Sequence, residues 1–272
     1  MIYSLLLENG DSFELNGDSV TAELKQSLSM SDFALTKESN LIERSYGDGA
    51  AKVGSSRLPM NQITLILSLA FLDDADCRLY LNTLFAALKD AEYLVDETNA
   101  IRTRIDLSSP SIVWDEGGYF RSGDATIVLN QVVPYWEATV EQEIVVAIEA
   151  GVPTEASIIN AGYAETPYVA SIAVAEQTVA VEYVEIENIA EGRSLSLESA
   201  SFGISGFELL ELDCEEGTAR LINEAYSTTL DVQDAFEAGA GYYNLTVGTN
   251  MLSLRCAVAA TVTFTYRPRY FV

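Results

Sequence analysis

The chain has 272 residues, of which 49% are hydrophobic and 10% aromatic, so it can bury a core and is not a wholly disordered protein. Its 41 acidic and 15 basic residues give a formal net charge of −26. A surface this acidic repels phosphate, which argues against binding to nucleic acid or to anionic membranes. The chain contains no histidine, which excludes Ser-His-Asp triads and imidazole metal sites.

The first residues are expected to form a β-hairpin, in which Asn9-Gly10 supplies the positive φ angles of a tight two-residue turn. A polar stretch follows, and then the glycine-rich segment ERSYGDGAAKVGSSR from Glu43 to Arg57. Its scarcity of bulky side chains predicts a long flexible loop. Loops of this length in compact domains are usually functional or contact a partner.

One helix is expected, and strands come before and after it. The segment ITLILSLAF, residues 63–71, predicts a strand buried on both faces, because its apolar residues barely alternate. The helix begins near Asp73, where several carboxylates complement the positive end of the helix dipole. Alternating segments at 101–107 and 125–133 predict strands. The apolar residues that recur on one face of the helix are Cys77, Leu81, Leu84, Phe85 and Leu88.

The second half of the chain is expected to consist of strands. Residues 137–150 form a β-prone connector, and the stretch NAGYAETPYVASIAV, residues 160–174, places an Asn-x-Gly turn and a proline before an alternating run. The later segments alternate as strands do, and one extra residue near Tyr183 predicts a β-bulge. We therefore expect an N-terminal domain at 1–150 and a β-sandwich at 151–272.

Little in the sequence points to catalysis. Cys77, Cys214 and Cys256 are odd in number and far apart, which predicts buried free thiols and a reducing compartment. The N-terminus lacks a basic region, and the longest apolar run is too short to span a bilayer, so we expect a soluble chain without a signal peptide or membrane insertion. Trp114 and Trp136 could stack on a sugar, although their positions at strand ends favour packing. We predict no enzymatic activity, no metal and no cofactor.

The order of these segments resembles the distal tail protein (Dit) family of long-tailed phages and gene transfer agents. The glycine-rich loop, the strand QITLILSLAF, the single helix and the ending NQVVPYWEA follow the order of the family's N-terminal domain. The segments IINAGYAETPYVASIAV and LTVGTNMLSLRCAVAATVTFTYRPRYFV are similar to the start and end of its C-terminal sandwich. The resemblance covers nearly the whole chain.

The resemblance implies a mainly β fold, with an N-terminal β-sandwich or split barrel that carries one helix, followed by a galectin-like (jelly-roll) sandwich. It implies a ring, a homohexamer, at the distal end of a virion tail, which is made in the host cytoplasm. The ring would join the tail tube to the baseplate or host-recognition apparatus, and DNA would pass through it. The implied partners are the tail tube protein and a tail-tip hub or tail-associated lysin-like protein, with the tape measure protein and fibres as further candidates.

We place the ring or tube contacts in the glycine-rich loop, and we expect acidic residues around the channel to let DNA slide. An alternative is a carbohydrate-binding adhesion module that acts through the C-terminal sandwich, with Tyr163, Tyr168 or Tyr226 as stacking surfaces. A glycosidase that uses two carboxylates is a weaker third reading, because 41 acidic residues make such pairs common by chance. The candidate contact residues in the loop are Arg44, Asp48, Lys52 and Arg57.

Overall fold

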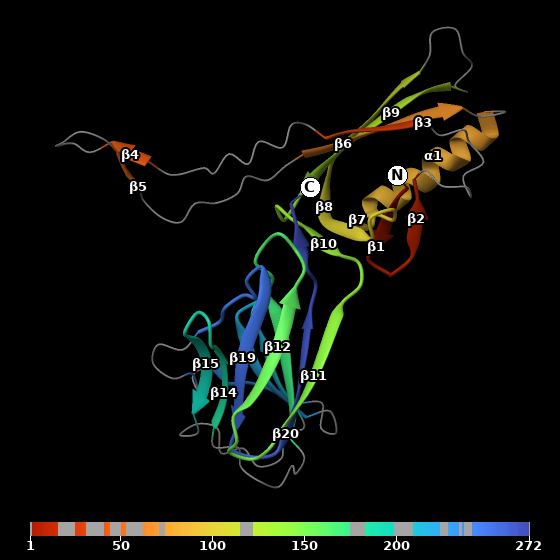
Figure 1. Ribbon diagram of the computed structural model, residues 1–272. Coiled ribbons are helices and arrows are strands. Elements are labelled where there is room, and N and C mark those ends of the chain that lie inside the picture. The colour runs from red at the N-terminus through yellow and green to blue at the C-terminus, as the bar shows by residue number, and fades with distance from the viewer. Residues whose placement is uncertain are drawn as a thin grey trace. The chain divides into compact units, whose positions relative to one another are not determined.

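The computed structural model divides the chain into two compact units (Figure 1), Met1–Thr139 with Phe271–Val272, and Val140–Tyr270. The described strands are antiparallel, and they accompany a single helix. The described part of the chain is therefore mainly β with one helix, as the sequence predicts. The residues that the structure describes are 2–15, 25–30, 41–43, 50–52, 62–70, 74–114, 122–174, 183–198, 209–223, 228–233, 236 and 241–271.

The first unit begins with the expected hairpin, formed by β1 (Tyr3–Leu7) and β2 (Ser12–Glu14). Its loop has three residues rather than two. The Leu7 N–H donates to the Asp11 carbonyl oxygen at 2.9 Å, and the Gly10 N–H donates to the Leu7 carbonyl oxygen at 2.9 Å. Gly10 has a φ of 85°, whereas Asn9 does not take a positive φ. A two-residue turn of the expected type needs positive φ at both central residues. Because only Gly10 has a positive φ, the hairpin forms the longer loop.

The hairpin continues into an antiparallel sheet in the order β2-β1-β7-β8-β9-β6-β3, with β10 beside β8. Strand β8 serves both halves of the sheet, because its first residues pair with β7 and its later residues pair with β9. Its register shifts between Leu107 and Ser109, which marks a β-bulge where the two halves meet. The added strands are β3 (Lys25–Met30), β6 (Gln62–Ala70), β7 (Ala91–Asp96), β8 (Ile101–Trp114), β9 (Ser122–Gln131) and β10 (Trp136–Ala138).

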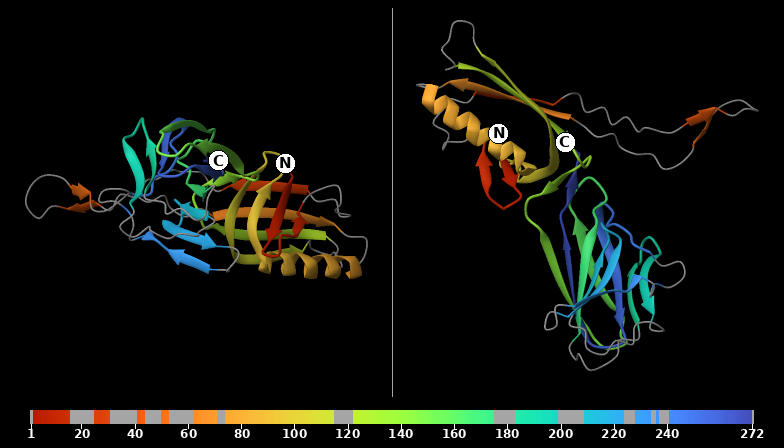
Figure 2. Two further views of the ribbon diagram at one scale, coloured as in Figure 1. Left: turned by 90° about the horizontal axis from the view of Figure 1, so that it is seen from below. Right: turned by 180° about the vertical axis from the view of Figure 1, so that it is seen from behind.

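The single helix, α1 (Asp74–Lys89), runs beside strands β1 and β7 (Figure 2). Cys77, Leu84 and Leu88 are buried, as expected. Phe85 instead keeps 38% of its surface exposed, because it lies about 100° around the helix from Leu84. In β6, Ile63, Leu65 and Leu67 are buried while the opposite face is only half-buried, so the expected burial on both faces holds for one face. No helix in the described residues is long and apolar enough to cross a membrane.

The second unit is a β-sandwich (Figure 1). One sheet has the order β11-β20-β13-β16-β17-β18, and the other has the order β12-β19-β14-β15. The segment expected as a connector contains β11, which pairs with β20 from Gln142 to Ile148. The first sheet contains β11 (Gln142–Ile148), β20 (Ala260–Tyr266), β13 (Tyr168–Val174), β16 (Leu209–Asp213), β17 (Thr218–Asn223) and β18 (Thr228–Asp231). The second sheet contains β12 (Thr154–Asn160), β19 (Gly248–Cys256), β14 (Tyr183–Asn188) and β15 (Arg193–Glu198).

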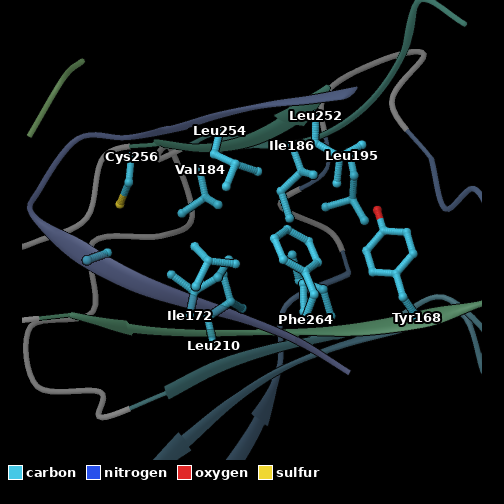
Figure 3. Close-up of a cluster of buried hydrophobic side chains, with 14 of the residues drawn as sticks. Tyr168, Ile172, Val184, Ile186, Leu195, Leu210, Leu252, Leu254, Cys256 and Phe264 are labelled. Atoms are coloured by element: carbon cyan, nitrogen blue, oxygen red, sulfur yellow. The ribbon is translucent and has the colours of Figure 1, made fainter. Parts of the chain in front are cut away.

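The core of the sandwich lies between its two sheets, whose side chains point toward one another (Figure 3). Leu252, Leu254 and Cys256 of β19 are fully buried, which confirms the alternation predicted from the sequence. On the facing sheet, Phe264 is fully buried and contacts Tyr168 with ring centroids 5.7 Å apart. The bulge expected near Tyr183 stays a prediction, because the residues just before β14 lie outside the described part of the chain.

Candidate assembly site

The loop predicted to carry ring or tube contacts, Glu43–Arg57, overlaps a short hairpin formed by β4 (Leu41–Glu43) and β5 (Ala50–Lys52). The two strands pair in register from Leu41 opposite Lys52 to Glu43 opposite Ala50, and neither pairs with another described strand. Lys52 therefore ends a strand rather than lying in a loop. The other candidate contact residues, Arg44, Asp48 and Arg57, lie outside the described residues.

The Asn-x-Gly turn of the second unit anchors the end of the chain. The N–H groups of Tyr163 and Ala164 both donate to the carbonyl oxygen of Arg269, at 2.8 and 3.1 Å. The Arg269 N–H donates to the hydroxyl of Thr166 at 3.2 Å, and its guanidinium pairs with Glu215. The strand β21 (Arg269–Tyr270) is thus fixed through both its backbone and a side chain.

Asn160 organises this turn from inside the protein, where it is 1% exposed. Its side-chain amide donates to the carbonyl oxygens of Ala164 and Leu245, at 2.9 and 3.2 Å. Its side-chain oxygen accepts the N–H of Gly162 at 3.0 Å. Each polar atom of the side chain therefore has a partner, as buried amides require. The motif that the sequence places at the start of a domain is a structural anchor within the sandwich.

The three cysteines form no disulfide with one another. All three are free, with Cys77 and Cys256 buried and Cys214 half-buried. Burial raises the pKa of the Cys214 thiol to about 11 and also raises the pKa of Cys256, which disfavours the reactive thiolate. Within the described ranges, no group of three His, Cys, Asp or Glu side chains could hold a metal ion.

The aromatic residues considered for sugar stacking differ in how exposed they are. Tyr163 is 72% exposed and contacts the ring of Tyr270 edge-on at 5.9 Å. Tyr168 is 1% exposed and belongs to the core, and burial raises its pKa well above the ordinary value. Trp136 is also 1% exposed, which confirms the packing role expected for it. Tyr226 and the side chain of Trp114 lie outside the described part of the chain.

No protein-family profile and no curated protein sequence matches this chain. Solved structures do match over nearly its whole length. The crystal structure of the phage SPP1 Dit protein, described as a paradigm of the hub adsorption apparatus in phages that infect Gram-positive bacteria, aligns with a TM-score of 0.65 and 11% identity. That alignment covers 98% of this chain and 99% of SPP1 Dit.

Two structures of the phage P2 baseplate in its activated conformation also align, one with calcium and one with strontium. Their TM-scores are 0.49 and 0.48, with 10% and 9% identity and 97% coverage of each chain. The SPP1 comparison alone carries the structural conclusion, because its TM-score is well above those of the two baseplate structures and its alignment covers 98% of the chain. The chain therefore has the fold of a phage distal tail protein.

Proposed function

We propose that this protein is the distal tail protein of a phage or phage-like particle. Copies of it form a ring, a hexamer, that joins the tail tube to the baseplate or host-recognition apparatus. The observation that carries this proposal is the alignment with SPP1 Dit over 98% of the chain. Because the alignment includes both units, it supports a protein with the same two-unit architecture rather than one that shares only a common β-sandwich.

The role is structural rather than enzymatic. The described residues contain no metal cluster, and the pKa values of Cys214 and Cys256 are raised, away from the range that a nucleophile needs. The net charge of −26 suits a conduit, because duplex DNA carries about one negative charge per 1.7 Å of its axis and slides along a surface that does not attract it. DNA would therefore pass through the ring without being bound by it.

The hairpin of β4 and β5 supplies contacts between neighbouring copies or with the tail tube. The segment that contains it, Leu41–Arg57, holds three basic and two acidic residues in a strongly acidic chain. Such a segment is attracted to the acidic surface of an adjacent copy. Arg44, Asp48, Lys52 and Arg57 remain our candidates for these contacts. The further partners are the tail tube protein and a tail-tip hub or lysin-like protein, with the tape measure protein and fibres beside them.

The mass of the purified chain in solution, measured by native mass spectrometry over a range of concentrations, tests the ring. We expect a species of six chain masses. Deletion of residues 47–55 should leave a folded monomer that no longer forms it. A wild-type chain that stays monomeric at every concentration and does not bind purified tail tube protein would overturn the proposal.

A second candidate function is sugar binding by the sandwich, and the exposed ring of Tyr163 favours it. An exposed aromatic ring offers a flat apolar face on which a ligand could stack. A glycan array probed with the full chain and with Tyr163→Ser tests this activity. Selective binding that the substitution abolishes would support it, whereas no binding by the wild-type chain would exclude it on the sugars tested.

A further inference from the structure

Most of the basic side chains that the structure describes form ion pairs with carboxylates of the same chain. The structure describes nine Lys and Arg side chains. Seven of them form ion pairs with glutamates, at N–O distances up to 3.7 Å. The two that form none are Arg78 and Lys89, and both belong to α1. The seven paired residues are Arg102, Arg104, Arg193, Arg220, Arg255, Arg267 and Arg269.

The two unpaired cations lie on the same exposed side of the helix. Arg78 and Lys89 are separated by eleven residues, which is about three turns and about 16 Å along the axis. Asn82 and Phe85 fall between them at positions i+4 and i+7, so the four residues share one exposed stripe that borders the buried face. Beside this stripe, Leu79 is 68% exposed. We name these five residues, Arg78, Leu79, Asn82, Phe85 and Lys89, the α1 stripe.

The helix dipole accounts for the position of Lys89 but not for that of Arg78. Lys89 lies in the last turn, where a cation interacts favourably with the helix dipole. Arg78 lies one turn from the N-terminus, where the dipole gives it no stabilisation. From Cys77 to Lys89 the helix has no acidic residue, although the chain has 41. The stripe therefore combines unpaired positive charge with exposed apolar surface, the combination that a protein partner would cover.

We propose that the α1 stripe binds the acidic surface of a second copy of this chain. The inference rests on the proposed function, in which copies join in a ring. Charge complementarity selects the occupant, because a second copy presents a net charge of −26 to the two cations. A basic face on one copy that meets an acidic face on the next is a head-to-tail contact, the kind that closes rings. Phe85 and Leu79 add apolar area to that contact.

Charge reversal tests the stripe. The double variant R78E/K89E places two carboxylates where the partner is acidic, and we expect at least a tenfold weaker association at low salt. The matched control is R104E/R193E, which makes the same change in net charge at two exposed arginines that already have glutamate partners. The control should change association by less than about threefold. Thermal unfolding of both variants verifies that the monomers remain folded.

Cross-linking tests the contact directly in the assembled wild-type protein. A carbodiimide activates a carboxylate, and the Lys89 amine then attacks it, which forms an amide and releases the urea by-product. In rings assembled from nitrogen-14 and nitrogen-15 chains, we expect cross-linked peptides of Lys89 that contain both isotopes. Lys89→Arg keeps the charge but cannot form this amide, so the cross-link should disappear while the ring persists.

The outcomes separate the two proposals. Rings of R78E/K89E with unchanged affinity, or assembled wild-type rings whose Lys89 gives only same-isotope cross-links, overturn the stripe and leave the ring intact. A wild-type chain that never assembles overturns the ring and the stripe with it. Loss of assembly in both the stripe variant and the arginine control would show that total charge governs association, and this result also overturns the stripe.

Discussion

Gly162 lies directly against the backbone of Arg269. A Cβ atom at position 162 would be 2.4 Å from the Arg269 carbonyl oxygen and 2.7 Å from its amide nitrogen. Backbone atoms held by three hydrogen bonds have little freedom to move away. We therefore expect Gly162→Ala to destabilise the chain by about 1–3 kcal/mol through overpacking.

Urea denaturation measures this cost, and Gly241→Ala is the matched control. A Cβ atom at Gly241 would meet nothing within 4 Å, and Gly241 does not have a positive φ. The control should therefore change the free energy of unfolding by less than about 0.5 kcal/mol. Equal stabilities of the two variants would show that the C-terminal strand is not fixed against the turn.

Asn160→Ala removes the side chain that organises the same turn. The carbonyl oxygens of Ala164 and Leu245 keep other donors, from the hydroxyl and the N–H of Thr166 respectively. The N–H of Gly162 loses its acceptor inside the protein, so we expect a loss of about 1–3 kcal/mol in the free energy of unfolding. Ser157→Ala, at an exposed position of the same strand, should be nearly neutral in the same denaturation experiment.

The sandwich could be predicted from the sequence because its strands alternate. Leu252 and Leu254 face the core while Ser253 and Arg255 face outward, and this period of two is specific to a half-buried strand. Strand β11 was predicted only as part of a connector. Its sequence QEIVVAI does not alternate clearly, and its place in the sandwich depends on pairing with β20 more than a hundred residues later. A single sequence carries no local signal of such a partner.

The candidate assembly site was harder to predict. The hairpin of β4 and β5 has three residues in each strand, too few to show a period. The α1 stripe has a signal in the sequence, since no acidic residue occurs between Cys77 and Lys89. The sequence does not show that Arg78 and Lys89 differ from the other described basic residues in lacking an ion pair. That difference requires the structure, because ion pairs such as that between Arg102 and Glu137 join residues far apart in the chain.

The position of β11 leads to a prediction about fragments. Ile148 is buried, and Ile144 and Val146 pack against the core of the second unit. We expect residues 140–270 to unfold cooperatively as an isolated fragment, which would identify an independent domain. Residues 151–270 lack β11 and expose the edge of β20, so this fragment should lose more than about 3 kcal/mol or aggregate. Equal stabilities in urea would instead support a domain boundary at 150/151.

Alkaline pH should weaken the second unit through Cys214. Burial raises the pKa of this thiol from 9.0 in the unfolded chain to about 11 in the native state. Below pH 8 the thiol is protonated in both states, and its contribution to stability does not change. Between pH 9 and 11 the unfolded state releases the proton while the native state keeps it, so the free energy of unfolding falls as the pH rises. This single group accounts for a loss of about 2 kcal/mol by pH 11.

The variant Cys214→Ala removes that contribution together with the coupling through which Cys214 raises the pKa of Tyr168, Tyr242 and Tyr243, so the comparison reports the thiol and this coupling. Urea denaturation of both proteins at pH 7.5, 9.5 and 10.5 should show a steeper decline for the wild-type chain, with equal slopes below pH 8. The same burial predicts slow alkylation, since only about a thousandth of a thiol with this pKa is thiolate at pH 8. Rapid modification of Cys214 in the folded protein, or parallel pH profiles for the two chains, would contradict a buried and protonated thiol.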